Sequence, residues 1–435
     1  MHPKLREKLG YNENSSPGRK LSIEEQPVSV SKKAKAIFLS VSLALVLFTI
    51  AGGLGVRAST NQGAYRQLGV YSEVLSRIRS EYVEDPNVPA VTDGALHGLV
   101  ESLDANSSYL NSEEYKKYKQ HKAEAQGGVG ATISKRFGYA AVISVMTGGP
   151  ADKAGVDAGD IIEAIEGKST RDMSLAEVRT LFSGEPGSNI NISVVRARRA
   201  EPQKLTITRD VVKVPATTDK MLEEGIGYLK VDALPKGKAQ EVAAKVKSLQ
   251  ASGAHKLILD LRNASDGDEQ EGIATANLFL NRGMITYLQG QRYPRQTFSA
   301  DPQKAITNLP LVVLVNRGTA GPAEIVAAAI LENARGDVLG DKTFGVGSVQ
   351  KVIEIADGSA LILSVAKYYT PGGKAIQDTA VTPNIMVADS EEDFALPDED
   401  DNNTPQQEQK KRSPQQDEQL RRAIQVLKNR DQKAT

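Results

Sequence analysis

Residues 316–325 form the segment of this chain whose residue types are best suited to chemistry. An apolar run at 311–315 precedes the segment, and a helical pattern follows from Pro322 onward. In serine hydrolases a buried strand, a tight turn and a helix start present a reactive hydroxyl beside free backbone N–H groups. The centre of this turn is Gly321, which has no side chain. The sequence therefore predicts a turn of the kind that presents a nucleophilic side chain, with glycine at the position of that side chain.

The elements expected around that turn are apolar strands that alternate with amphipathic helices. Strands are expected at 225–231, 257–261, 311–315, near 338, at 349–355 and at 361–366, and helices at 238–252, 270–280 and 322–333. Such alternation predicts an α/β core with a mainly parallel sheet. Residues 62–125 have helical periodicity on both sides of the breaker Asp85-Pro86-Asn87.

Composition excludes several classes of function. Lysine plus arginine equals aspartate plus glutamate, at 54 each among 435 residues, so no overall charge favours a nucleic-acid partner. The absence of cysteine excludes thiol catalysis, disulfides and cysteine-ligated metals. The four histidines, His2, His97, His121 and His255, are scattered, and we expect none of them to have a second histidine or a carboxylate as a partner in a zinc site. We therefore expect no metal and no cofactor.

An apolar stretch at 36–56 is about long enough to cross the hydrocarbon core of a membrane. Lys32, Lys33 and Lys35 precede it, so the positive-inside rule places a basic head, 1–35, in the cytoplasm and the remaining chain outside it. The alternative is a cleaved signal peptide, but its head would be long and residues 56–59 make a poor cleavage site. An uncleaved signal anchor at 36–57, with an extracytoplasmic body, is the favoured interpretation.

Ordered motifs between residues 65 and 387 resemble those of the carboxyl-terminal processing peptidases, also called tail-specific proteases. They are LDANSSY at 103–109, GGVG at 127–130, LDLRN at 259–263, TFGVGSVQ at 343–350 and KYYTP at 367–371. Members of this family are serine endopeptidases with a PDZ domain inserted before the catalytic core. The chain is identified as a member of that family, and its body is expected to be extracytoplasmic as in the bacterial members.

The resemblance implies a division of the chain into domains. A helical subdomain at 62–125 is followed by a β-sandwich-like PDZ domain at 126–213 and by the crotonase-like or ClpP-like protease core at 214–390. Residues 391–435 are charged and poor in apolar residues, which predicts a disordered tail. Leu420, Ile424 and Leu427 predict a short terminal helix within that tail.

A PDZ domain binds a peptide by adding it as a strand to a sheet edge, while N–H groups of a glycine-rich loop hold its terminal carboxylate. The resemblance places that loop at Gly128, Val129 and Gly130, with Ile133 on the strand beside the peptide. The alternative is a PDZ domain that acts only as an intramolecular lid.

The chemistry of the family resembles a serine–lysine dyad, in which a neutral lysine accepts the serine proton. The family's motifs place the serine at Gly321 and the lysine at Val346. The residue that orients the dyad remains as Gln350. Neither dyad position can therefore perform its step.

Two further departures affect the oxyanion hole that the resemblance implies. The N–H donor after the serine is replaced by Pro322, which has no N–H group. Asp266 stands where the second donor loop has glycine, and its carboxylate would repel an oxyanion. Thr319, Ser348, or a carboxylate pair of Asp266 and Glu324 are the other groups that could act in the cleft.

These observations predict a membrane-anchored, extracytoplasmic pseudoprotease. It would bind C-terminal peptide tails or extracytoplasmic proteins through its PDZ domain and vacant cleft, and it could pair with an active relative or with itself. The first alternative is an active serine-type endopeptidase that uses non-standard residues. The second is a purely structural module whose PDZ domain binds no free peptide.

Overall fold

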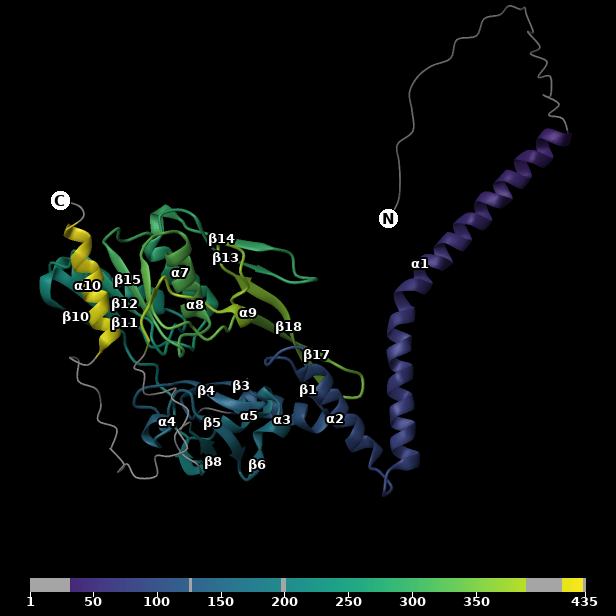
Figure 1. The fold of residues 1–435 in the computed structure, drawn as a ribbon, viewed down its shortest axis with the longest axis horizontal. Helices are drawn as coiled ribbons and strands as arrows, with labels where there is room; N and C mark the ends of the chain where they lie inside the picture. Colours follow the sequence, from purple (N-terminus) through teal and green to yellow (C-terminus); the bar gives the residue numbers. More distant parts are fainter. Residues whose placement is uncertain (1–31, 125–126, 197–200, 389–416, 433–435) are drawn as a thin grey trace, which may run out of the picture. The chain divides into compact units, whose positions relative to one another are not determined.

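The computed structural model describes residues 32–124, 127–196, 201–388 and 417–432 (Figure 1). The chain divides into two compact units, Met1–Val88 and Pro89–Thr435. Most of the predicted basic head and of the predicted disordered tail lies outside the described residues.

The first unit contains one long helix, α1 (Lys32–Glu81). It ends before the Asp85-Pro86-Asn87 segment, and α2 (Val88–Glu101) begins just after it, so the predicted break is confirmed. Among the residues whose side chains are described, no helix is both long and apolar enough to cross a membrane. The transmembrane helix expected at 36–57 is therefore not found. Side chains at 47–65 lie outside the described part of the chain.

The second unit opens with α2, a short strand β1 (Ser108–Leu110) and α3 (Ser112–Glu124). The strand was not predicted, since residues 62–125 were expected to be entirely helical. It forms because Leu110 and Tyr115 are buried against Ala360 and Ile362, and because β1 pairs antiparallel with a strand of the core. Tertiary packing here overrides the helical periodicity of the neighbouring sequence.

Residues 127–208 form the PDZ domain, which has one antiparallel sheet of six strands. Its sheet has the order β3-β4-β5-β8-β9, with β6 paired to β5, and a separate ribbon joins β2 to β7. The elements are β2 (Gly127–Gly128), β3 (Ala131–Arg136), β4 (Tyr139–Val145), α4 (Pro150–Lys153), β5 (Ile161–Ile165), β6 (Lys168–Ser169), η1 (Thr170–Asp172), α5 (Leu175–Phe182), β7 (Ser183–Gly184), β8 (Asn189–Val195) and β9 (Gln203–Thr208). The expected sandwich-like arrangement is thus a single sheet whose apolar face packs on α5.

The main sheet of the core has the order β10-β11-β12-β15-β16-β19. The strands from β11 to β19 are parallel, as predicted, and the edge strand β10 is antiparallel. The strands are β10 (Thr218–Met221), β11 (Ile226–Lys230), β12 (Lys256–Asp260), β15 (Leu311–Val315), β16 (Asp337–Gly340) and β19 (Ile385–Met386), and the helices are η2 (Glu223–Gly225), α6 (Lys238–Ala251), α7 (Glu269–Phe279), α8 (Pro322–Glu332) and α10 (Glu418–Gln432).

Helices cover both faces of this sheet. Leu257 and Leu259 point to the side of α6, α7 and α8, whereas Ile258 points to the side of α10. The split follows from the alternation of side chains along a strand. Both β12 and β15 are buried on both faces; β15 is apolar throughout, and β12 is apolar at its three central residues, 257–259.

A second sheet in the core is antiparallel, which corrects the expectation of a mainly parallel arrangement. Its order is β1-β18-β13-β14, and β17 pairs with β18. Its core elements are β13 (Met284–Gln289), β14 (Gln296–Ser299), β17 (Ser348–Glu354) and β18 (Ala360–Tyr369), with η3 (Pro302–Lys304) and α9 (Ile376–Thr379) in the connections. Only five residues join β17 to β18, too few for the crossover that parallel neighbours need.

Candidate functional site

The turn at Gly321 follows the carboxyl end of β15, which is an interior strand of the parallel sheet. Gly321 caps α8 with φ 59° and ψ −123°, a conformation that residues with side chains rarely adopt. A Cβ atom built on Gly321 would meet only the Ser265 carbonyl oxygen, at 3.8 Å. Gly321 therefore has a backbone conformation that is unfavourable for other residues, although the space beside its Cα atom is open.

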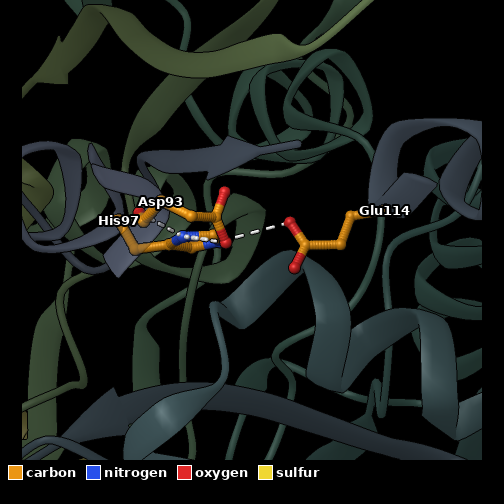
Figure 2. A group of neighbouring side chains, drawn as sticks. All are labelled: Asp93, His97 and Glu114. Carbon is orange, nitrogen blue, oxygen red and sulfur yellow. Dashed lines mark hydrogen bonds and ion pairs between the residues drawn. The ribbon is translucent and has the colours of Figure 1, made fainter. Parts of the chain in front are cut away.

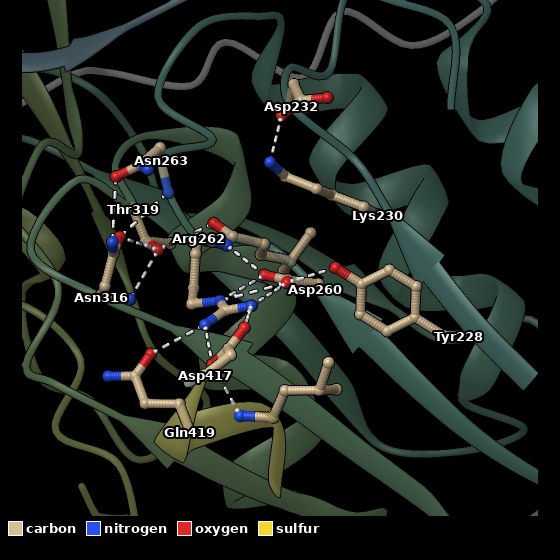
Figure 3. A network of polar contacts seen from close by, with 12 residues as sticks. Tyr228, Lys230, Asp232, Asp260, Arg262, Asn263, Asn316, Thr319, Asp417 and Gln419 are labelled. Carbon is tan, nitrogen blue, oxygen red and sulfur yellow. Dashed lines mark hydrogen bonds and ion pairs between the residues drawn. The ribbon is translucent and has the colours of Figure 1, made fainter. Parts of the chain in front are cut away.

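Buried hydrogen bonds hold the residues before Gly321. The Thr319 hydroxyl donates to the Leu261 carbonyl at 2.8 Å and accepts from the Asn316 N–H at 3.0 Å. The Asn316 amide exchanges two hydrogen bonds of 2.9 Å with Asn263, to its N–H and its side-chain oxygen (Figure 3). The shape of the turn is thus set by the neighbouring strand end and does not depend on a side chain at Gly321.

Glu324 joins the start of α8 to the loop that carries Val346. Its side chain is fully buried and accepts hydrogen bonds from the N–H groups of Gly321 (3.0 Å), Gly345 (2.8 Å) and Val346 (2.7 Å) and from the Thr343 hydroxyl. Burial raises the pKa of Glu324 to about 7, although these four hydrogen bonds act in the opposite direction.

Gly321 and Val346 both donate their N–H groups to the same atom, Glu324 Oε2. The structure therefore brings the two positions of the predicted dyad side by side. Neither position has a group that can attack a carbonyl or accept a proton. The surrounding scaffold is present and the two reacting groups are not.

One of the two N–H donors expected in the oxyanion hole is absent. Pro322 is the first residue of α8 and is buried, so no N–H is present at that position. The Ser265 carbonyl oxygen is the atom that a side chain at Gly321 would meet first. Asp266 is exposed and its own carbonyl accepts the Leu234 N–H at 2.8 Å.

The alternative hydroxyl groups of the cleft have structural partners. Thr319 is fully buried and donates to a backbone carbonyl, as described above. Ser348 Oγ accepts from Gln350 Nε2 at 2.7 Å and lies 3.4 Å from Asn106 Nδ2. These two partners are carboxamides, which cannot act as a general base. A third contact, at 3.5 Å, is the Ser364 hydroxyl, which donates to the Asp104 carboxylate at 3.0 Å. Gln350 thus orients Ser348, and the carboxylate of Glu324 is already saturated with donors.

The network behind the turn continues to the C-terminal helix (Figure 3). Arg262 binds Asp417 through two hydrogen bonds of 2.8 Å, just before α10, and it also binds Asp260, which is fully buried. Tyr228 completes the environment of Asp260 with a hydrogen bond of 2.7 Å. Sequence reasoning missed this cluster, although the LDLRN motif contains both Asp260 and Arg262.

The glycine-rich loop of the PDZ domain lies at the start of β3, an edge strand of its sheet. Gly130 has a φ of 70°, and its carbonyl accepts the Met146 N–H at 2.8 Å. The Gly128 N–H donates to Asp210 at 2.9 Å, so one of the expected carboxylate donors is engaged within the domain. Ile133 is buried on β3.

Arg179 spans the groove between α5 and β3. Its guanidinium is 3.4 Å from the Ile133 carbonyl and 3.4 Å from the Asn106 side-chain oxygen. The PDZ sheet also contacts the core, because Ser265 Oγ donates to Thr132 at 2.7 Å and hydrogen-bonds with Ser144. The PDZ domain therefore touches the loop that faces Gly321.

No metal or cofactor was expected from the sequence. Three possible metal ligands nevertheless lie together at Asp93, His97 and Glu114. Asp93 precedes His97 by four residues, the spacing that brings two side chains to one face of a helix, and this signal could have indicated the group.

A two-faced α/β core with an inserted PDZ domain and a strand–turn–helix site defines the class of PDZ-containing processing peptidases. Residues 225–387 match peptidase family S41, and residues 142–196 match the PDZ domain. The carboxy-terminal-processing protease of Bartonella bacilliformis is 32% identical over 358 residues, which cover 81% of this chain and 82% of that protein. The chain belongs to this family of carboxy-terminal processing proteases.

Two further comparisons agree with that assignment. The carboxy-terminal processing protease CtpA of Bacillus subtilis is 32% identical over 350 residues, covering 79% of this chain and 74% of the relative. Among solved structures, a photosystem II D1 C-terminal processing protease superposes with a TM-score of 0.61 at 26% identity, covering 73% of this chain and 92% of that one.

Proposed function

We propose that this protein is a pseudoprotease of its family, which binds peptide tails or partner proteins and does not cleave them. One observation carries the proposal: the N–H groups of Gly321 and Val346 meet at Glu324, and neither residue has a reactive side chain. The missing donor at Pro322 supports it further.

Restoring the reactive groups tests this proposal. The purified protein should leave an unfolded substrate with an apolar C-terminal tail intact, and the triple variant Gly321→Ser, Pro322→Ala, Val346→Lys should cleave it. The matched control is Gly321→Ala with the same two other substitutions, which lacks only the hydroxyl and should stay inactive. Cleavage by the unsubstituted protein, free of contaminating protease, would contradict the proposal.

The main alternative is an active serine-type endopeptidase that uses non-standard residues, and membership of a peptidase family is consistent with it. In that case Ser348→Ala or Thr319→Val would abolish cleavage by the otherwise unsubstituted protein. The buried position of Thr319 and the short hydrogen bond of Ser348 to a carboxamide favour the non-cleaving interpretation. The contact of Ser348 with Ser364, which donates to Asp104, is the observation that favours the active alternative.

Peptide binding is proposed for the PDZ domain, at the edge strand β3 and the loop formed by Gly128, Val129 and Gly130. Supporting observations are the edge position of β3 and the positive φ of Gly130. A terminal carboxylate would approach the loop, with the peptide beside Ile133. Because Arg179 spans the groove, a bound peptide has to displace or share its contact with the Ile133 carbonyl.

A purely structural PDZ domain is the remaining alternative, and the contacts of Arg179 and of Ser265 with the domain are the observations that favour it. Fluorescence titration of labelled peptides with free or amidated C-termini distinguishes the two. A preference for the free carboxylate supports binding at the loop, and equal or absent binding supports the structural alternative.

We further propose that the N-terminal segment at 36–57 anchors the protein to a membrane, with the bulk of the chain extracytoplasmic, in the periplasm or at the cell exterior. The apolar composition and the preceding lysines support this proposal. Extraction of the full chain by detergent but not by carbonate would agree with it. Pairing with an active relative or with a second copy is expected to show as co-purification after mild cross-linking.

A further inference from the structure

Three side chains that sequence reasoning did not connect meet at the junction of α2 and α3. Asp93 and His97 lie one helical turn apart on α2, and Glu114 lies in the first turn of α3. One possible ligand atom from each residue lies within 4.8 Å of the other two. Figure 2 shows the His97 ring beside Asp93 and in line with Glu114.

The orientation of the His97 ring is fixed from both sides. Its Nδ1 atom is 2.9 Å from the Asp93 backbone carbonyl, which can only accept, so Nδ1 carries a proton. The Tyr109 ring packs edge-on against the imidazole, with centroids 5.2 Å apart. The remaining nitrogen, Nε2, faces Glu114 Oε2 at 3.2 Å. This is the arrangement of a metal-binding histidine whose other ring nitrogen donates to a backbone carbonyl.

Both carboxylates are oriented by one residue, Asn111. Its backbone N–H donates to Glu114 Oε2 at 2.9 Å, and its side-chain amide donates to Asp93 Oδ2 at 3.3 Å. The three side chains are only partly exposed, by 35% for Asp93, 18% for His97 and 22% for Glu114. The group is thus ordered by its surroundings and still open to water, which could complete a coordination shell.

We propose that Asp93, His97 and Glu114 bind a divalent transition-metal ion such as Zn²⁺, which joins α2 to α3. One imidazole and two carboxylates are ligands that Zn²⁺ accepts, at about 2.0–2.2 Å each. Two such ligands on a tetrahedral ion lie roughly 3.3 Å apart by the same bond lengths, close to the 3.2 Å between Nε2 and Glu114. With a neutral imidazole, the two carboxylates also balance the charge of the ion.

The competing account is an ion pair in which protonated His97 bridges the carboxylates. In that account the Glu114 carboxylate is the nearer partner, 3.2 Å from Nε2, and the Asp93 carboxylate is the more distant one, 3.7 Å from Nδ1. Asp93→Asn therefore separates the two accounts. The variant removes one metal ligand and leaves the contact between His97 and Glu114 intact.

The experiment uses chelator-treated full-length protein titrated with ZnCl₂ at pH 8 by calorimetry, with thermal unfolding measured in parallel. One equivalent of Zn²⁺ should bind and raise the Tm, whereas Mg²⁺, which prefers six oxygen ligands, should have no effect. Asp93→Asn and His97→Gln should each weaken Zn²⁺ binding by at least about tenfold, the lower end of what loss of even an outer partner costs.

The matched control is His255→Gln, because His255 is exposed and lies outside the group. It should bind Zn²⁺ like the unsubstituted protein. Circular dichroism without metal shows whether each variant is folded, and the visible absorption of bound Co²⁺ reports a tetrahedral site directly. Affinity for Zn²⁺ that is unchanged in folded Asp93→Asn, or absent in the unsubstituted protein, would overturn the proposal and leave an ion pair only.

Discussion

Each of the two candidate sites of this protein contains a glycine with a positive φ. The two sites differ in whether their function needs a side chain at that position. Gly321, with a φ of 59°, stands where a peptidase needs a side-chain hydroxyl. Gly130, with a φ of 70°, stands where a peptide-binding domain needs only a backbone N–H. Side-chain substitutions can therefore remove peptide cleavage, while binding of a peptide carboxylate by backbone N–H groups does not depend on them.

The surroundings of the two turns differ as well. The turn at Gly321 is enclosed by Glu324, Asn316 and Thr319, whose hydrogen bonds are buried. The loop at Gly130 lies at the edge of its sheet and is held by the Met146 N–H. We infer that the first turn keeps its shape for the stability of the core and the second for binding.

The largest effect is expected from Glu324→Ala. It leaves four buried donors, including the N–H groups of Gly321 and Val346, without an acceptor, and it should lower the unfolding free energy by about 3–5 kcal/mol. Denaturant unfolding measures the loss. A cost below about 1 kcal/mol would mean that the turn is not held by this carboxylate.

Arg262→Ala should destabilise the core by a similar amount, about 3–5 kcal/mol, because it leaves the fully buried Asp260 without its cation. The comparison variant is Asp417→Ala, which removes the other partner of Arg262. Asp417 is 25% exposed, so its loss should cost only about 1 kcal/mol. If both variants lowered the free energy of unfolding equally, the contact of Arg262 with the residue before α10 would be the one that stabilises the protein.

Stability should also depend on pH through Glu324. Burial raises its folded-state pKa to about 7, above the ordinary value of 4.5. Because the pKa is higher in the folded state, Glu324 contributes fully to the free energy of unfolding below pH 4.5. That contribution is lost as the pH rises through 7, by at most about 1.4 kcal/mol per pH unit. Unfolding free energies at pH 5 and pH 8 should therefore differ by more in the unsubstituted protein than in Glu324→Gln.

Smaller effects than those of Glu324→Ala and Arg262→Ala are expected from a matched pair, Gly321→Ala and Gly130→Ala. Each forces a side chain into a positive φ and should cost about 1–3 kcal/mol. Only Gly130→Ala should also weaken the binding of C-terminal peptides, measured by fluorescence titration. If both variants bound peptide equally well, the carboxylate loop would have to lie elsewhere on the PDZ domain.

Much of the fold follows from local sequence. The run at 311–315 is a strand with the predicted bounds, because five consecutive apolar residues fit a strand that is buried on both faces. The start of the helix Leu175–Phe182 is likewise fixed locally, by the capping box of Ser174 and Glu177. In both cases the signal lies within a few neighbouring residues.

The antiparallel second sheet could not be predicted in the same way. Residues 349–355 and 361–366 were expected to be strands, but their apolar patterns do not say which strand lies beside them. The pairing of β1 with β18 joins residues that are about 250 positions apart in the chain. The contacts of Arg262 with Asp417 and of His97 with Glu114 were missed for the same reason.

Residue type alone establishes that Gly321 has no hydroxyl, Val346 no amine and Pro322 no N–H group. The fold, in contrast, is what brings two of these positions together, because Gly321 and Val346 donate to one oxygen atom of Glu324. The chemical groups at a position follow from the residue type alone. Which distant segments come together depends on the whole fold, in which buried polar groups must have hydrogen-bond partners.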